Sequence, residues 1–137
     1  MIDLSSEFGV RVAARLDQEL IIWLTTVRAD GTPQPSPAWF LWADQTLLIY
    51  SQPNKQKLRN IAQNPKVALN FNSDQDGGAI AIITGDAQID PQVPADQISP
   101  YLEKYRMAIA DLGSAPEDFA QSYSVAIRVT PTSLRGY

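Results

Sequence analysis

Three cations follow one another at the predicted start of a short helix, in the segment Asn54-Lys-Gln-Lys-Leu-Arg59. Asn54 is a good N-cap, and Asn64-Pro65 ends the predicted helix Lys55–Gln63. A helix N-terminus carries partial positive charge, so each cation there is disfavoured by a few tenths of a kcal/mol, up to about 1. A bound phosphate would reverse this cost, because backbone N–H groups, the lysines and the Ser51 hydroxyl would all point at one anion. The charges alone fit a solvated helix face equally well.

Prolines occupy alternate positions, 33, 35 and 37, in the strand-like segment Thr32–Ala43. In an extended strand the N–H groups of alternate residues point to the same side, so all three missing donors lie on one side. The segment is therefore predicted to form a sheet edge or a gap in a barrel. The pattern by itself favours protection against edge-to-edge association. The alternative is a slot kept open for a ligand or a partner chain.

Aromatic residues could form the wall of a site for a flat ligand. Trp39 and Trp42 directly follow the prolines. Core packing is the favoured interpretation for Trp42, whereas Trp39 stays open between core and ligand contact. The stripe that contains Tyr101 and Tyr105 is interpreted as core or dimer contact. No pair of carboxylates stands out for acid–base catalysis, so the sequence identifies no catalytic residue.

Composition limits the chemistry further. The 137 residues contain no cysteine and no histidine. These absences exclude disulfides, thiolate nucleophiles, Ser-His and Cys-His machinery and histidine-ligated haem, and no metal site is predicted. Redox or transfer chemistry would then belong to a bound cofactor.

The charge balance and hydropathy define the expected partners. The chain has 45% hydrophobic residues, 19% charged residues and a formal net charge of −4. One domain over residues 1–137 is expected, and the acidic balance argues against nucleic acid as a partner. The sequence shows neither a signal peptide nor a membrane span, so we expect a cytoplasmic protein without a membrane partner.

Alternating and helical patterns predict the elements that position these residues. Six strands with helices in two long connections suggest a mainly β fold, an antiparallel closed or split barrel with short flanking helices. Gly85 is predicted to form a bulge inside the long strand Ala79–Ile89. The remaining predicted strands are Glu19–Arg28, Thr46–Ser51, Lys66–Asn72 and Tyr123–Thr130. The remaining predicted helices are Glu7–Leu16, a helical section with Ile98, Tyr101, Leu102, Tyr105, Ile109 and Leu112 on one stripe, and a second short helix that begins with a capping box at Ser114–Glu117 and runs through Phe119 and Gln121.

The sequence resembles the pyridoxamine 5′-phosphate oxidase-like superfamily of FMN-binding split barrels over almost its whole length. Thr26–Pro33, Pro37–Trp42 and Ile49–Ile61 carry the resemblance most strongly, and Asn64–Leu69 and Thr84-Gly85 follow in the expected order. The similarity is closest to a short-chain subgroup described as deazaflavin-dependent, which uses coenzyme F-420. Other short members bind FMN.

The resemblance implies a six-stranded split barrel of Greek-key type and a homodimer with two cofactors at the interface. The cofactor is FMN or, alternatively, the deazaflavin coenzyme F-420. The cofactor-binding positions that it implies are, for the phosphate, Tyr50, Ser51, Lys55, Gln56 and Lys57, and, for the strand along the ring, Ser36, Pro37, Ala38 and Trp39.

The chain departs from the classical oxidase pattern at several positions. In the phosphate site Lys55 replaces a hydroxyl residue and Gln56 replaces an arginine. Ser36 stands where the classical oxidase has an arginine, Leu41 where it has a lysine, and Ile80 where it has a flavin-contacting glutamine. Pyridoxamine phosphate oxidation is therefore not expected. The resemblance favours a flavin- or deazaflavin-dependent oxidoreductase acting on a small organic substrate. The alternative is a non-catalytic flavin-binding carrier or sensor.

Overall fold

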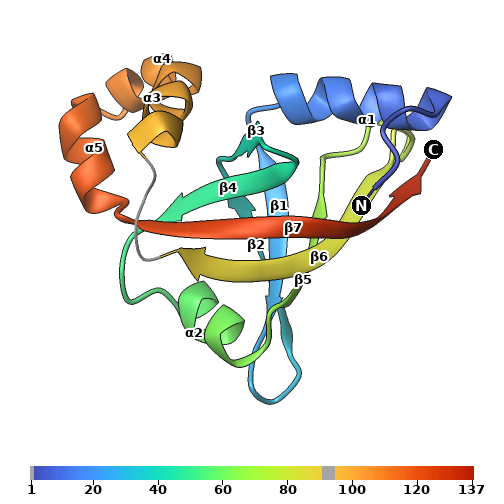
Figure 1. Cartoon of the computed structure of the whole chain (residues 1–137), viewed down its shortest axis with the longest axis horizontal. Helices are drawn as coiled ribbons and strands as arrows, with labels where there is room; N and C mark the ends of the chain where they lie inside the picture. The colour runs from blue at the N-terminus through green and yellow to red at the C-terminus, as the bar shows by residue number, and fades with distance from the viewer. Residues whose placement is uncertain (1, 91–94) are drawn as a thin grey trace.

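The computed structural model describes residues 2–90 and 95–137, with the backbone alone for residues 95–98. Its strands are β1 (Ile22–Val27), β2 (Pro33–Ala38), β3 (Leu41–Ala43), β4 (Thr46–Ser51), β5 (Lys66–Asn70), β6 (Ala81–Asp90) and β7 (Val125–Gly136). Its helices are α1 (Glu7–Gln18), α2 (Gln56–Gln63), α3 (Ala95–Lys104), α4 (Arg106–Asp111) and α5 (Pro116–Ser122). Figure 1 shows the strands as one curled sheet with the helices at its margins.

The sheet is a split barrel. Seven strands pair in the order β2-β1-β5-β6-β7-β4-β3, and every pair is antiparallel. The two edge strands, β2 and β3, are consecutive in the chain, and only Trp39 and Phe40 separate them. A sheet whose two edges meet at such a short corner has to curl round on itself. The predicted mainly β split barrel is confirmed.

The prolines occupy the positions of β2 at which a backbone N–H would point away from β1, as their spacing predicts. Pro33, Pro35 and Pro37 face Val27, Thr25 and Trp23 of β1, and among the described strands β2 pairs with β1 alone. Residues that lack an N–H fit the non-hydrogen-bonded positions of an antiparallel pair. The outer edge of β2 therefore presents carbonyl acceptors without the matching donors.

The strand count differs from the prediction because the segment after the prolines divides in two. β2 ends at Ala38, and the short strand β3 pairs with β4 as a separate hairpin. Asp44 and Gln45 form its two-residue turn, with φ of 53° and 62°. A turn of type I′ requires positive φ at both central residues, a conformation that glutamine seldom adopts. Asp-Gln is not a typical turn pair, so the turn was not predicted, and the predicted ring-side strand is broken at Trp39.

The main core fills the barrel. Leu16, Leu24, Phe40 and Ile83 are each at most 1% exposed there. At Gly85 the register between β6 and β7 shifts, which confirms the predicted bulge. A Cβ at this position would lie 2.6 Å from the Thr130 carbonyl oxygen, so only glycine allows the two strands to approach this closely.

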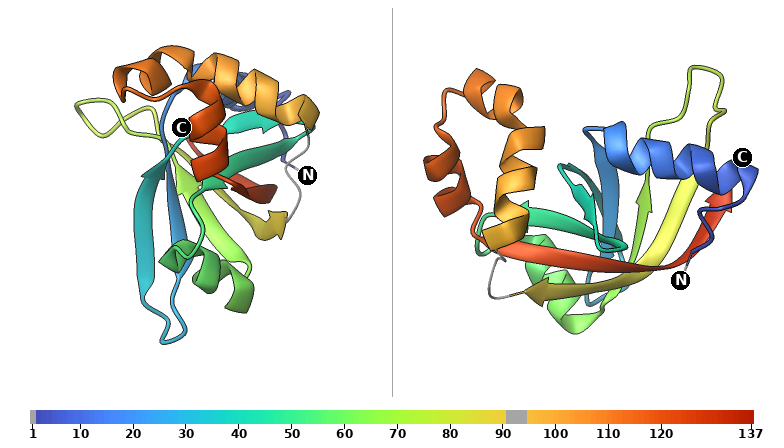
Figure 2. Two further views of the ribbon diagram at one scale, coloured as in Figure 1. Left: turned by 90° about the vertical axis from the view of Figure 1, so that its left-hand side faces the viewer. Right: turned by 45° about the horizontal axis from the view of Figure 1, so that its top comes forward.

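A second apolar cluster lies on the other face of β4, under α3–α5. Leu47 and Ile49 of β4 face the barrel, whereas Leu48 and Tyr50 face this cluster. Figure 2 shows α3–α5 gathered at one end of the β4–β7 pair and α1 at the other. Tyr101 and Tyr105 are 2% and 1% exposed, which confirms that the tyrosine stripe is core. The Ile98 side chain lies outside the described residues.

Tyr105 and Lys104 fasten α3 to the corner between the two edge strands. The Tyr105 hydroxyl accepts from the Phe40 N–H at 2.8 Å and lies 2.8 Å from the Leu20 carbonyl oxygen and 3.0 Å from that of Phe40. Lys104 Nζ donates to the Phe40 carbonyl oxygen at 2.8 Å and lies 3.8 Å from the centre of the Phe40 ring. Both the N–H and the carbonyl oxygen of Phe40 are thus hydrogen-bonded, which holds the corner that carries Trp39.

The Lys104 ammonium should give stability a distinctive pH dependence. Burial lowers the pKa of Lys104 to about 8, from 10.5, against the opposing influence of Asp17 and Glu19. Between these two values the unfolded chain binds a proton that the folded chain has lost. The free energy of unfolding therefore rises with pH across this window on account of Lys104.

We expect Lys104→Met to remove that rise. Urea unfolding at several pH values from 7 to 10.5 measures it, with Lys66→Met as the control for loss of an exposed lysine, whose side chain is 74% exposed. Parallel stability profiles for Lys104→Met and the wild type would contradict the assignment.

No helix within residues 2–90 and 95–137 has the length and apolar character needed to cross a membrane.

Candidate functional site

A cavity of about 310 Å³ opens where the ends of β2 and β4, the start of α2 and the α3–α5 cluster meet. The residues from β2, β4 and α2 that line it, with those just beside these elements, are Pro37, Ala38, Trp39, Ile49, Tyr50, Ser51, Gln52, Lys55 and Lys57. The remaining residues, from the helical section and the approach to β7, are Tyr101, Leu112, Phe119 and Tyr123. Segments far apart in the sequence therefore form one site.

The cavity brings together seven of the nine positions predicted for the cofactor: Pro37, Ala38, Trp39, Tyr50, Ser51, Lys55 and Lys57. Ser36 does not line it and lies further back along β2, paired with Leu24. Gln56 does not line it either, because its side chain follows the helix surface. The Gln56 amide donates to Asn60 Oδ1 at 2.8 Å, and its carbonyl accepts from Arg59 Nη2 at 2.8 Å.

One side of the cavity is cationic. Lys55 is exposed and Lys57 is half-buried, and neither forms an ion pair with any described residue. Burial lowers the pKa of Lys57, and the neighbouring charge of Lys55 lowers it further. Both causes disfavour the ammonium in the free protein. An anion bound between the two lysines would remove the second cause and offset the first.

The start of α2 adds backbone donors on the same side, one residue later than predicted. Lys55, not Asn54, is the N-cap, and no side chain caps the helix. Asn54 instead takes a left-handed conformation with φ of 64°, which asparagine tolerates better than most residues. The Leu58 N–H donates to the Lys55 carbonyl oxygen at 3.1 Å, whereas no side chain caps the N–H groups of Gln56 and Lys57. The Ser51 hydroxyl donates to the Gln52 carbonyl oxygen at 2.7 Å, so it would have to rotate before it could donate to a ligand.

Another part of the lining is aromatic. The Trp39 ring stacks on Tyr105, with 4.6 Å between ring centres and 4° between planes, and on Phe119 at 5.5 Å. Phe119 stacks in turn on Tyr123 at 4.4 Å. Trp39 thus belongs both to the second core cluster and to the cavity wall, whereas Trp42 packs against the barrel core as predicted.

Sequence comparison decides the family. The family model of pyridoxamine 5′-phosphate oxidase matches residues 10–137. The chain belongs to the pyridoxamine 5′-phosphate oxidase family. No curated protein matches the sequence.

Solved structures extend this result. An F420 reductase shares 26% identity with this member of the pyridoxamine 5′-phosphate oxidase family at a TM-score of 0.70, over 89% of this chain and 94% of the other. General Stress Protein 26 from Bacillus anthracis is 20% identical, with a TM-score of 0.70 over 91% and 89%. HutZ, a heme storage protein from Vibrio cholerae, is 17% identical, with a TM-score of 0.72 over 96% and 95%. The last two likenesses establish the fold alone.

A buried amide holds α2 in place in this pyridoxamine 5′-phosphate oxidase family member. Asn60 is 2% exposed, and its Nδ2 donates to Thr26 Oγ1 and to Gln34 Oε1, both at 2.9 Å. Its Oδ1 accepts from Gln56. The lysine-bearing helix is thereby tied to both strands of the β1–β2 hairpin, and Asn60 fixes where the cationic side lies relative to β2.

We expect Asn60→Ala to lower the free energy of unfolding by about 1–2 kcal/mol, because it leaves buried partners without their hydrogen bonds. Urea unfolding measures the change, and Gln63→Ala on the exposed surface of the same helix is the matched control. Equal stability of Asn60→Ala and the wild type would show that the network does not hold the helix.

Sequence reasoning missed several lining residues, above all those of the helical section. Leu112, Phe119 and Tyr123, together with Ile49 in β4 and Gln52 just after it, were not predicted to line the cavity, and Tyr101 was assigned to core or dimer contact. Phe119 lies in α5, whereas Tyr123, predicted to begin the last strand, is the C-cap of that helix. Nothing local indicated which part of the barrel these two aromatic residues would cover.

Proposed function

We propose that the chain is a flavin- or deazaflavin-dependent oxidoreductase acting on a small organic substrate. The cofactor ring would lie against Trp39 and the end of β2. Its phosphate would lie at Lys55 and Lys57, where α2 begins. As predicted from the sequence, we further propose that the protein acts in the cytoplasm.

One observation carries this proposal: a single cavity has an aromatic side and a cationic side. Trp39 and Phe119 offer flat apolar surface, while Lys57 is a half-buried ammonium without a carboxylate partner among the described residues. A planar ring joined to a phosphate by a short chain matches both sides at once. A purely apolar ligand would leave the lysines unused, and a free phosphate would leave the aromatic wall unused.

The residues present fit such a cofactor. The outer edge of β2 offers carbonyl acceptors near Pro37, which suits the N–H of an isoalloxazine or deazaflavin ring. The ring, when bound, supplies the hydride chemistry that the side chains of this chain lack. The chain itself would hold the phosphate through Lys55 and Lys57, orient the ring against Trp39, and exclude water with the α3–α5 cluster.

A homodimer is part of the proposal. The cavity, at about 310 Å³, lies at the lower end of the roughly 300–1,000 Å³ typical of ligand sites. A tricyclic ring with its phosphate arm would be only partly enclosed by one chain. A second copy is expected to cover the rest of the cofactor.

The choice between FMN and coenzyme F-420 stays open within the proposal. The likeness to an F420 reductase favours the deazaflavin. The family's FMN-binding members support the alternative. Haem, the ligand named for HutZ, is disfavoured because none of the 137 residues is a histidine that could ligate its iron.

The decisive experiment identifies the small molecule that the protein carries. Purified protein is denatured, and the mass and visible absorption spectrum of the released compound are recorded. FMN and coenzyme F-420 are then each added to the cofactor-free protein, because an expression host may lack the deazaflavin. Tight binding of either coenzyme is expected. Failure of both to bind would overturn the proposal.

Turnover separates the enzyme from the alternative, a non-catalytic carrier or sensor. The loaded protein is mixed with a reductant and a panel of small organic acceptors, and oxidation of the reduced coenzyme is followed by absorbance. Reoxidation that depends on an organic acceptor supports the oxidoreductase. Stable binding without turnover across the panel would favour the carrier.

A further inference from the structure

A second, smaller cavity of about 110 Å³ lies directly beside the first. Four residues line both cavities: Tyr50, Tyr101, Phe119 and Tyr123. Only the second is also lined by Leu102, Ala120 and Ser124. The two cavities therefore share an aromatic wall. Because the proposed function does not use the second cavity, its purpose needs its own explanation.

The lining of this second cavity carries no formal charge at neutral pH. Leu102, Phe119 and Ala120 are apolar, and the polar atoms are tyrosine hydroxyls and the Ser124 hydroxyl. Burial, reinforced by the neighbouring tyrosines, raises the pKa of Tyr101, so its phenol stays neutral. A charged ligand group would lose its hydration here without gaining a partner. The first cavity, with its two lysines, has the opposite preference.

The size of the second cavity also restricts its ligand. An apolar cavity of about 150 Å³ is large enough to bind benzene in another protein. A space of about 110 Å³ beside a larger cavity, with four lining residues in common, therefore suits a single ring or a short branched alkyl group. It does not suit a whole cofactor.

The walls have the shape that a ring requires. Phe119 and Tyr123 stack face to face, with 4.4 Å between ring centres and 16° between planes, so the pair presents an outer ring face and ring edges. Tyr50 and Tyr101 meet edge to face, with 81° between planes and 4.6 Å between centres. An aromatic ring between these pairs would meet both faces and edges, which are the favoured geometries.

We propose that this cavity is the subsite for the uncharged, apolar end of the substrate, an aromatic ring or a short branched alkyl group. The assignment rests on the proposed function, in which the neighbouring cavity holds the cofactor ring. The shared wall then places the reacting end of the substrate beside that ring. Specificity would come from α3 and α5, which supply Leu102, Phe119 and Ala120.

Ala120 allows a direct test. Ala120→Phe fills the second cavity without changing a residue of the first. Gln121→Phe places the same ring on an exposed position of the same helix and is the matched control. The probe is phenol, with benzoate as its charged counterpart, added to the cofactor-free full chain. Two-dimensional amide NMR follows the signals of Ala120 and Ser124.

Phenol should shift these two signals in the wild type and in Gln121→Phe. Its affinity should fall by about tenfold or more in Ala120→Phe, because the added ring occupies the space. Benzoate should bind the wild type at least about tenfold more weakly than phenol, because the cavity cannot compensate its charge. If Ala120→Phe does not fold, Ala120→Leu takes its place. Equal phenol affinity in the wild type and in the filled variant would overturn the subsite.

Titration of the same samples with FMN and coenzyme F-420 separates this inference from the proposed function. Coenzyme affinity in Ala120→Phe should stay within about twofold of the wild type, because Ala120 does not line the first cavity. Coenzyme binding without phenol binding at Ala120 and Ser124 would overturn the subsite alone. Phenol binding without binding of either coenzyme would overturn the proposed function, and the substrate role of the subsite with it.

Discussion

Lys57→Ala is expected to weaken binding of the phosphorylated coenzyme by about 1.5–3 kcal/mol, or roughly 10- to 150-fold. Lys57 is half-buried at the cavity and has no carboxylate partner among the described residues. A phosphate bound there would form a charge-assisted hydrogen bond that water screens only in part. Loss of the ammonium removes this bond and leaves the phosphate with Lys55 and the α2 backbone.

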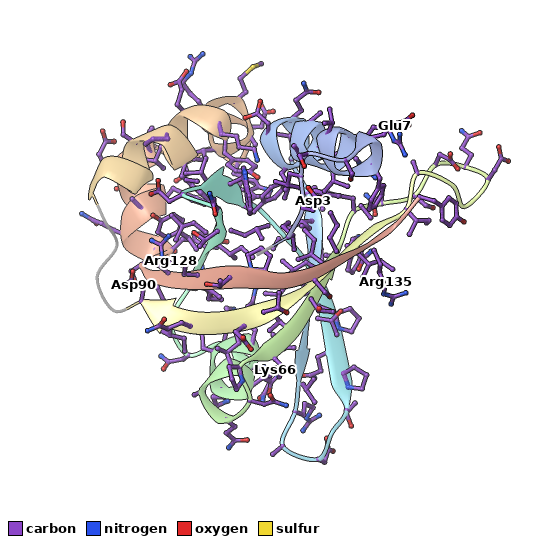
Figure 3. All side chains as sticks on the ribbon, turned by 45° about the vertical axis from the view of Figure 1, so that its right-hand side comes forward. Asp3, Glu7, Lys66, Asp90, Arg128 and Arg135 are labelled. Carbon is purple, nitrogen blue, oxygen red and sulfur yellow. The ribbon has the colours of Figure 1, made fainter. Side chains whose placement is uncertain are left out.

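Titration of cofactor-free protein with FMN and with coenzyme F-420, followed by fluorescence, measures this effect. Riboflavin has the ring of FMN without its phosphate, so its affinity should be almost unchanged by Lys57→Ala. The control variant is Lys66→Ala, which removes an equal charge from a lysine that is labelled in Figure 3 and pairs with Asp86 at 2.7 Å. Unchanged affinity of Lys57→Ala for both phosphorylated coenzymes would contradict the phosphate assignment.

The features that sequence predicted correctly depend on covalent properties of a few neighbouring residues. The prolines of β2 mark a sheet edge because proline has no N–H in any context. Gly85 marks a close approach of two strands because no other residue lacks a Cβ. Lys55 and Lys57 both line the cavity because they lie two residues apart at the start of α2, while their role in binding a phosphate stays a prediction.

The features that sequence did not predict depend on contacts between distant segments. Phe119 reaches the cavity because α5 packs over β4, and β4 is buried on both faces. Whether a strand is covered on one face or two is decided by the whole topology. Trp39 stacks on Tyr105, which lies 66 residues further along the chain, and no local sequence pattern predicts this contact.

Some local errors also have a physical cause. Asn54 was expected to cap α2, yet it adopts a positive φ, and the N-cap is Lys55. The same short amide side chain suits an N-cap and a left-handed turn, so the residue type does not distinguish the two. The result matters for the site, since no side chain caps the N–H groups of Gln56 and Lys57 at the start of α2.

Trp39→Ala tests the aromatic side of the cavity, as Lys57→Ala tests the cationic side. Unlike Lys57→Ala, it should lower stability and should weaken binding of ligands with and without a phosphate. Removal of the half-buried indole is expected to lower the free energy of unfolding by about 3 kcal/mol, at the low end for replacing tryptophan with alanine. The loss comprises the stacks on Tyr105 and Phe119 as well as buried area. Affinity should fall for FMN and for riboflavin alike, because the wall contacts the ring that both share.

Trp42→Ala is the matched control for Trp39→Ala, since Trp42 packs against the barrel core and does not line the cavity. It should lower stability in urea unfolding while leaving riboflavin affinity close to that of the wild type. Trp39→Phe should recover most of the affinity, because a phenyl ring can still stack on Tyr105. Titrations are run at a temperature where every variant is folded by circular dichroism. Riboflavin binding that is lost equally in Trp39→Ala and Trp42→Ala would mean that Trp39 acts through the fold, whereas loss in Trp39→Ala alone requires contact between its ring and the ligand.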